Sequence, residues 1–231
     1  MYLWELKQSI LTMSIKTESI AACSRCGKRT QITTYKSINI SEDPSLKEKV
    51  KDGSLFLWKC PHCGQMNLAK YDILYHDPEK KLMVWLLQDE NMSETQMHSI
   101  SLHAKAIGNY TLRRVTDTGS LMEKVIIFDN ALDDTVIEVC KYVLKMEMVS
   151  KASGEDAAKV ILDAPFHFFR LNEDGQKSMT FIYPDEARMK SLDIGFNVYE
   201  DCEGILRRNP GIVPEEGFAK VDQEWLSHYF R

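Results

Sequence analysis

Short segments rich in β-branched and aromatic residues dominate the chain between residues 20 and 87. Side chains of these types pack well on a pleated surface, so each segment is typical of a strand. The segments cover residues 30–37, 55–59, 66–75 and 82–87. Their close succession predicts an antiparallel sheet, with a turn at residues 76–80, where Asp77 precedes Pro78.

One helical interruption is predicted inside this region, over residues 45–53. The segment follows Pro44, places the apolar residues Leu46 and Val50 four positions apart, and ends at Gly53. A helical start, an apolar repeat of four and a glycine stop together predict a short helix.

Helical periodicity becomes the main signal after the polar stretch at residues 89–95, which we take as a boundary. Residues 96–107 are compatible with a helix, residues 110–115 with a strand, and an apolar repeat from Leu121 with another helix. The clearest helix follows, and Asp133 and Asp134 stand where capping and the helix dipole favour acids. Its apolar face comprises Leu132, Val136, Val139, Cys140, Val143 and Leu144.

The C-terminal part predicts a hairpin after a break at residues 153–156. Residues 160–171 and 178–183 flank a turn at 172–175, and Pro165 implies a bulge or an edge strand. We further expect a strand at residues 195–199, a loop at 207–217 and a closing helix at 221–229. In that helix Val221 and Trp225 should face inward.

The composition is that of a folded protein with a sizeable core. Hydrophobic residues make up 44% of the 231 residues, and the net charge is −5, so no overall field selects nucleic acid or a membrane as the partner. No apolar run reaches the roughly 18 residues that a membrane helix needs. Residues 13–88 hold twelve Lys/Arg against eight Asp/Glu, so this part is basic and the remainder acidic.

The first 13 residues allow two interpretations. Met13 is followed by Ser14, so the segment is either an N-terminal extension whose start was assigned too early or a short helix that packs Leu3, Trp4 and Ile10. Polar residues interrupt it, and we expect neither a signal peptide nor an anchor.

Two copies of one cysteine motif carry the strongest chemical signal. Cys-Ser-Arg-Cys-Gly begins at residue 23 and Cys-Pro-His-Cys-Gly at residue 60, with 33 residues between Cys26 and Cys60. Two thiolates spaced in this way form a zinc knuckle, and two knuckles complete a tetrahedral site with no open position for a substrate. We therefore predict one structural Zn²⁺ held by Cys23, Cys26, Cys60 and Cys63 in a zinc ribbon.

The two cysteine pairs allow two other chemistries besides zinc binding. A redox Cys-x-x-Cys site normally stands alone at a helix start in a βαβ unit, which the predicted strands do not provide. An iron centre in the same four-sulfur cage remains an alternative to zinc. Six cysteines, four of them in metal-type pairs, favour a reducing compartment, so we expect a cytoplasmic protein.

The paired motifs also carry a family resemblance. Together with residues 37–44, 51–55 and 75–81, they resemble the CpXC family, a prokaryotic domain named for two Cys-Pro-x-Cys motifs. The similarity extends through residues 132–134, about the first two thirds of the chain. Ser24 departs from the family pattern, which has proline there, but no ligand is lost. The resemblance implies a bacterial origin and a zinc-bearing fold, and it implies no particular activity.

These signals predict an α+β protein in which an N-terminal zinc ribbon with an antiparallel sheet is followed by helices and a C-terminal β-hairpin region. We expect the chain to consist of four parts. They are a possible extension at residues 1–13, the ribbon at 14–90, a strand and helices completing the CpXC-like domain at 91–152, and an α+β region at 153–231.

Several polar residues allow a functional and a structural interpretation. His62 lies in the second knuckle, and with four cysteines available a solvent-facing turn residue is favoured over a ligand. His76 and Asp77 resemble an acid/base pair, although a turn supported by Asp77 explains them as well. Asp133 and Asp134 suit a hard cation or a helix cap.

The remaining candidates are two cysteines, two basic residues and three aromatic residues. Cys140 is expected to be a core thiol, and acidic neighbours of Cys202 should discourage a thiolate. Lys28 and Arg29 suit phosphate contacts. A group of aromatic residues suits base stacking or, as we prefer, core packing. That group is Phe166, Phe168 and Phe169.

The leading functional hypothesis is a non-catalytic zinc-binding module that docks an unidentified protein partner or a second copy, without a membrane partner. The alternative is a nucleic-acid-binding regulator that uses the basic ribbon. A third is an enzyme with a site in the C-terminal region. The chain has no glycine-rich phosphate loop, Gly-x-Ser-x-Gly elbow or His-Glu-x-x-His motif, so no catalytic residue is assigned.

Overall fold

The structure is a computed structural model that describes residues 14–88, 94–185 and 188–230. The interpretations of residues 1–13, and most of the expected boundary at 89–95, lie outside these residues. The chain divides into two compact units, Met1–Val125 with Glu216–Ala219 and Ile126–Glu215 with Lys220–Arg231. Helices and strands occur in both, which confirms the α+β class.

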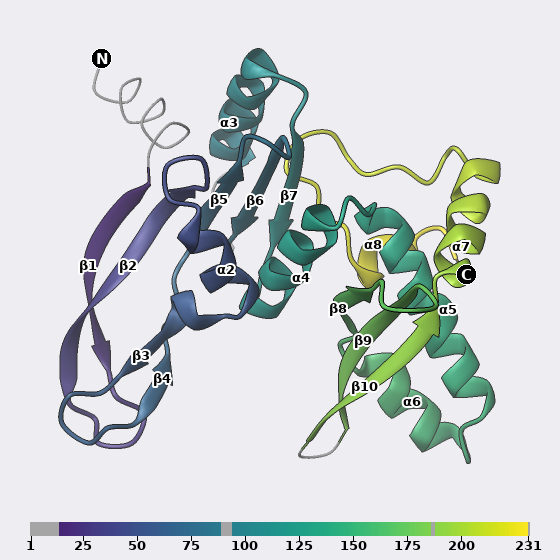
Figure 1. The fold of residues 1–231 in the computed structure, drawn as a ribbon, viewed down its shortest axis with the longest axis horizontal. Coiled ribbons are helices and arrows are strands. Elements are labelled where there is room, and N and C mark those ends of the chain that lie inside the picture. Colours follow the sequence, from purple (N-terminus) through teal and green to yellow (C-terminus); the bar gives the residue numbers. More distant parts are fainter. Residues whose placement is uncertain (1–13, 89–93, 186–187, 231) are drawn as a thin grey trace. The chain divides into compact units, whose positions relative to one another are not determined.

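The first unit is built on a five-stranded sheet in the order β1-β2-β5-β6-β7 (Figure 1). Its strands are β1 Ile15–Ala22, β2 Arg29–Asn39, β5 Ile73–Asp77, β6 Leu82–Leu86 and β7 Thr111–Val115. The other elements are α2 Ser45–Lys51, the 3-10 turn η1 Ser54–Phe56, β3 Leu57–Lys59, β4 Met66–Leu68, α3 Glu94–Ile107 and α4 Thr118–Asp129. β3 and β4 form a separate two-stranded sheet, and the end of α4 from Ile126 belongs to the second unit.

The large sheet is mixed, so the prediction of an antiparallel sheet was wrong. β1–β2 and β5–β6 are antiparallel, whereas β2–β5 and β6–β7 are parallel. Parallel neighbours need a crossover connection: α3 joins β6 to β7, and the segment with α2, β3 and β4 joins β2 to β5. Such connections cover the faces of a sheet, and accordingly every residue of β5 and β6 is buried.

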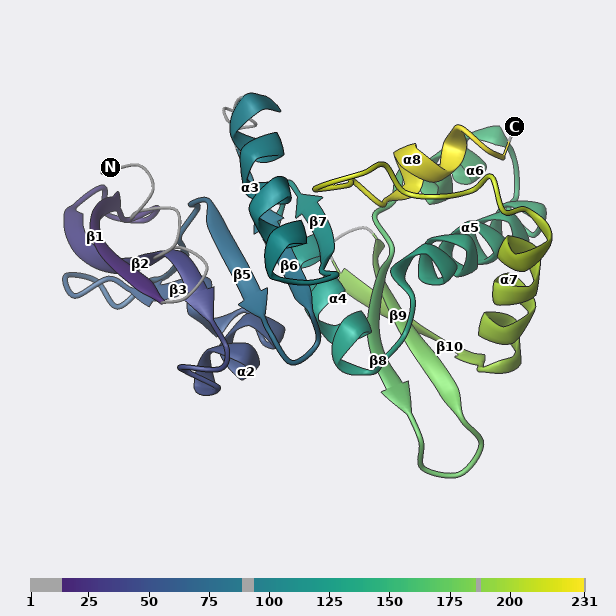
Figure 2. The same ribbon diagram turned by 90° about the horizontal axis from the view of Figure 1, so that it is seen from above.

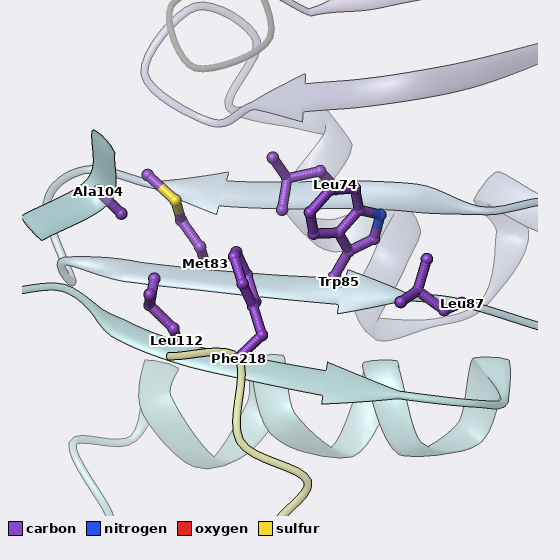
Figure 3. Close-up of a cluster of buried hydrophobic side chains, with 7 residues drawn as sticks. All are labelled: Leu74, Met83, Trp85, Leu87, Ala104, Leu112 and Phe218. Carbon is purple, nitrogen blue, oxygen red and sulfur yellow. The ribbon is translucent and has the colours of Figure 1, made fainter. Parts of the chain in front are cut away.

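A cluster on one face of the sheet joins α3 to the late segment Glu216–Ala219. It consists of Leu74, Met83, Trp85, Leu87, Ala104, Leu112 and Phe218 (Figure 3). The ring centroids of Trp85 and Phe218 are 5.2 Å apart in an edge-on contact, and the Arg114 N–H donates to the Ala219 carbonyl at 3.0 Å. The chain thus returns near its C-terminus to complete the core of the first unit.

The predicted helix after Pro44 is confirmed as α2. Leu46 and Val50, four residues apart, are both buried. Lys47 Nζ lies 2.8 Å from the Asp77 carboxylate at the end of β5, so α2 is fixed to the sheet by apolar burial and by an ion pair.

The second unit centres on α5 Asp134–Ser150, with other helices gathered around it (Figure 2). These are α6 Glu155–Asp163, α7 Asn197–Arg208 and α8 Gln223–Ser227. An antiparallel sheet, in the order β10-β9-β8, consists of β8 His167–Asn172, β9 Ser178–Asp185 and β10 Arg188–Gly195. The Asp133 carboxylate accepts the Thr135 N–H at 2.8 Å, as the capping interpretation predicted.

The strands expected at residues 160–171 and 195–199 differ from the observed elements in their bounds. The first part of residues 160–171 belongs to α6, where Glu155 and Asp156 favour a helix start through the dipole. Pro165 restricts Ala164 to an extended backbone, so the strand begins only after it. Residues 195–199 span the end of β10 and the start of α7, and β10 was missed because its polar, mostly exposed sequence shows no apolar alternation.

The other C-terminal expectations hold except at the bounds of the closing helix and of the loop before it. β8 lies at the edge of its sheet, and its register shifts between Phe168 and Arg170, as Pro165 implied. The closing helix is shorter than the expected 221–229, because α8 covers only Gln223–Ser227. Trp225 is buried within it, and Val221 is buried just before it. Among the described residues, no helix is long and apolar enough to cross a membrane.

Candidate metal centre

The first cysteine pair lies in the tight turn between β1 and β2. The Cys23 N–H donates to the Lys28 carbonyl at 3.0 Å, and the Gly27 N–H donates back to the Cys23 carbonyl at 2.9 Å. Gly27 has a φ of 69°, a left-handed conformation that glycine adopts without steric cost. The local sequence therefore determines the turn that brings Cys23 and Cys26 together.

The second pair repeats this geometry between β3 and β4. The Cys60 N–H donates to the Gln65 carbonyl at 2.8 Å, the Gly64 N–H donates to the Cys60 carbonyl at 2.9 Å, and Gly64 has a φ of 72°. The glycine after each Cys-x-x-Cys motif thus adopts the left-handed conformation that closes the turn.

The four sulfurs converge at one place. Cys23 Sγ lies 3.6 Å from Cys63 Sγ, Cys26 Sγ lies 3.7 Å from Cys60 Sγ, and all four lie within 4.8 Å of one another. A zinc tetrahedron with Zn–S bonds of about 2.3 Å has S···S edges of about 3.8 Å. Disulfide bonds are far shorter, and all four cysteines are free. The donor set and its dimensions fit one tetrahedrally coordinated metal ion.

The four cysteines differ in exposure, and two of them differ in pKa. Cys23 and Cys60 are buried, whereas Cys26 is exposed. A hydrogen bond from the Cys26 backbone, helped by one from Arg25 and by the neighbouring thiols, lowers the pKa of Cys23 to about 6. The Gln65 backbone has the same effect on Cys63, but burial and the other sulfurs outweigh it and raise the pKa of Cys63 to about 11. Binding of a metal would therefore release protons from this site.

Asn67 is a supporting residue that the sequence did not reveal. This buried β4 side chain accepts hydrogen bonds from the Ser24 N–H and hydroxyl, both at 2.9 Å, and donates to the Gln65 carbonyl at 2.9 Å. Asn67 thus ties one cysteine turn to the other. Proline at position 24 would lack both donors, so the departure from the Cys-Pro-x-Cys pattern is matched by Asn67. Only the tertiary structure places these residues together.

His76 and Asp77, the two candidates for an acid/base pair at the end of β5, both make polar contacts. The Asp77 carboxylate accepts the Lys80 N–H at 3.2 Å and the Tyr75 hydroxyl at 3.3 Å, in addition to its ion pair with Lys47. His76 Nε2 lies 3.1 Å from the Tyr110 hydroxyl. Both His76 and Asp77 are buried, and their contacts support the turn interpretation.

The two thiols of the second unit are not members of the four-sulfur cluster. Cys140 on α5 and Cys202 on α7 are both buried, and they interact with each other. Their hydrogen bond, with burial, raises the pKa of Cys140, and it lowers the pKa of Cys202 against the effects of burial and Asp201. Burial agrees with the expectation of a core thiol for Cys140.

Burial and ring contacts distinguish between the two interpretations of the aromatic residues and of His62. Phe166 stacks on Tyr183 with ring centroids 4.5 Å apart, and Phe168 is 1% exposed, so both pack in the unit. Phe169 remains 45% exposed. His62 is exposed in the second cysteine turn, as a solvent-facing turn residue should be.

Comparison with known proteins adds one finding. A family model described as "CpXC protein" matches residues 21–141, just over half of the chain, and this span includes all four clustered cysteines. Neither the curated proteins nor the solved structures gave a match.

Proposed function

The chain belongs to the CpXC family, and on that premise we propose that it is a zinc-binding, non-catalytic module for protein interaction. In this proposal Cys23, Cys26, Cys60 and Cys63 hold one structural Zn²⁺. Four sulfur donors at tetrahedral spacing are typical of structural zinc and leave no coordination position for a substrate. The bound ion would supply a crosslink between the β1–β2 and β3–β4 hairpins.

The observation that carries the interaction role is an apolar face on the β3–β4 hairpin. Leu57 and Leu68 are directly opposed across the strands and are 47% and 51% exposed, and Met66 on the same face is 50% exposed. A hairpin of two three-residue strands is not stable by itself in water. Grouped exposed apolar residues on a hairpin that a metal holds rigid favour a docking surface. The partner would be another protein or a second copy.

A pull-down with a surface variant tests this proposal. The tagged full chain is recovered from an extract of its source cells after nuclease treatment, bound proteins are identified, and each is rebound in purified form. We expect Leu57→Ser/Leu68→Ser to lose the partner, because the exposed apolar pair supplies the contact. Val160→Ser, at another exposed apolar residue in α6, is the control and should retain it.

Equal partner recovery by both variants would contradict the apolar docking face. Recovery of material that nuclease removes would instead support the second candidate, nucleic-acid binding. That candidate is favoured by four basic side chains near the cysteine turns, all of them exposed, and it predicts binding that weakens steeply with salt. The four are Arg25, Lys28, Arg29 and Lys59.

A further inference from the structure

An open groove runs between β2 and β3 in the first unit. Its volume is about 380 Å³, and it is lined by residues 30–33 of β2, residues 57–59 of β3 and Pro61. A strand that presents a face contributes every second residue, because side chains alternate. Here both strands contribute consecutive residues, which indicates that the groove follows strand edges. The two strands are visible beside each other in Figure 1.

The edge of β2 at this groove has no strand partner in the described part of the chain. β2 pairs with β1 on its other side and meets β5 only at residues 37–39. The Cys23 N–H bonds across the hairpin to Lys28, and backbone groups alternate from there. Gln31 and its opposite residue Ile20 therefore direct their N–H and C=O groups away from each other. The backbone N–H and C=O of Gln31 therefore face the groove.

The edge of β3 at the groove is also open, in part. Hydrogen bonds from Cys60 to Gln65 and from Ala69 to Phe56 bracket the β3–β4 ladder. By the same alternation, Leu57 and Lys59 direct their backbone groups away from β4. The Leu57 N–H is already bonded to the Ser54 carbonyl, so β3 offers the groove the Leu57 carbonyl and both backbone groups of Lys59, and β2 offers those of Gln31.

We propose that this groove binds an extended, acidic peptide segment of a partner protein by β-strand addition. The proposal rests on the interaction function proposed above and names its site and the class of partner segment. An added strand would pair with backbone groups at a spacing of two residues, as open strand edges allow. Lys59 lines the groove, and Arg29 directly precedes its first lining residue, Thr30. These two side chains, with Arg25 and Lys28 in the adjoining cysteine turn, are exposed and make no salt bridge to any described residue. This charge complements glutamate or aspartate.

The edge chemistry favours peptide over nucleic acid. An open strand edge offers N–H donors and C=O acceptors in alternation, and a peptide backbone supplies the partner for each. A phosphodiester offers acceptors alone, so it would leave the carbonyls of Gln31, Leu57 and Lys59 without donors. Basic side chains would attract either polymer, but only an extended peptide matches both borders.

Peptide selection on the full-length, zinc-loaded protein tests the proposal. Random ten-residue peptides displayed on phage are selected, and the enriched peptides are synthesised and titrated by fluorescence anisotropy. We expect sequences in which acidic and apolar residues alternate. Gln31→Pro, which removes an edge donor, should raise the Kd at least tenfold, whereas Ile20→Pro, at the directly opposed position on β1, should leave it unchanged.

A charge pair provides a second readout that does not depend on proline being tolerated. Lys59→Glu should also raise the Kd at least tenfold, while Lys70→Glu, which makes the same charge change outside the groove lining, should not. Zinc content is measured for every variant, so that loss of binding is not confused with loss of the metal.

Three outcomes would overturn the groove assignment. They are the absence of enriched peptides, equal binding by the groove and control variants, and tight binding of an oligo(dT) probe that displaces the peptides. If the pull-down partner is recovered but binds Gln31→Pro and Lys59→Glu normally, the groove assignment fails while the interaction function stands. If no protein partner is recovered, the interaction function itself fails.

Discussion

At the scale of single residues, Cys60 offers the sharpest test of the metal site. It is 1% exposed, and its sulfur lies 3.7 Å from that of Cys26. Cys60→Ser replaces a thiolate with a poor zinc ligand, and structural zinc contributes its binding energy to folding. We expect bound zinc, measured by atomic emission, to fall from one ion per chain to none, and Tm and solubility to fall with it.

Two comparisons make this result specific. Chelation of the wild-type protein should lower Tm in the same way, whereas Cys140→Ala, at a buried thiol on α5, should keep the metal. A Cys60→Ser protein that retained both its zinc and its Tm would show that the site is assigned wrongly. Iron in place of zinc in the purified protein would contradict only the choice of metal.

At the scale of elements, Tyr199 joins α7 to the start of α5. Its hydroxyl accepts the Asp133 N–H at 2.9 Å, and burial raises the pKa of Tyr199 above its usual value. Tyr199→Phe leaves that N–H without its acceptor, so we expect a loss of about 1 kcal/mol in the free energy of unfolding at neutral pH. Denaturant titrations followed by circular dichroism measure it.

The same residue predicts an alkaline pH dependence. An unfolded tyrosine ionises near pH 10, while the raised pKa keeps buried Tyr199 protonated at that pH. Its contribution is therefore complete below about pH 10 and is lost as the pH rises further. Stability should fall less steeply above pH 10 in Tyr199→Phe than in the wild type. Parallel curves would refute the role of Tyr199.

At the scale of the whole molecule, the first unit depends on a segment from near the C-terminus. Phe218 is 6% exposed and packs against Trp85, although it lies far outside the family span of residues 21–141. Phe218→Ala removes a large core side chain, which typically costs about 3–5 kcal/mol. We expect Trp85 to become more exposed, with red-shifted tryptophan emission and a lower Tm.

Phe169→Ala is the matched control, because Phe169 is 45% exposed and belongs to the second unit. It should change neither the emission nor the Tm appreciably. A fragment ending at residue 141 should behave like Phe218→Ala in its first unit. If that fragment were as stable as the full chain, the returning segment would have no role in the core.

Local chemistry explains which parts of this protein could be predicted from its sequence. The two cysteine turns depend on neighbours within six residues and on the left-handed conformations of Gly27 and Gly64. The start of α5 depends in the same way on Asp133. Both were predicted with the correct residues, as was α2 with its buried Leu46 and Val50, because these signals require no knowledge of the rest of the fold.

Only the tertiary structure decided which elements lie next to one another. Strand patterns indicate burial but not partners, so the parallel pairings of β2 with β5 and β6 with β7 were missed. The same holds for Asn67 between the cysteine turns and for Phe218 in the first core. The sequence by itself determined the four metal-type cysteines and their turns. The repeated motif also predicted that all four would meet at one site. The contacts that support this meeting, such as those of Asn67, and the groove between β2 and β3 join residues distant in sequence, which no local propensity encodes.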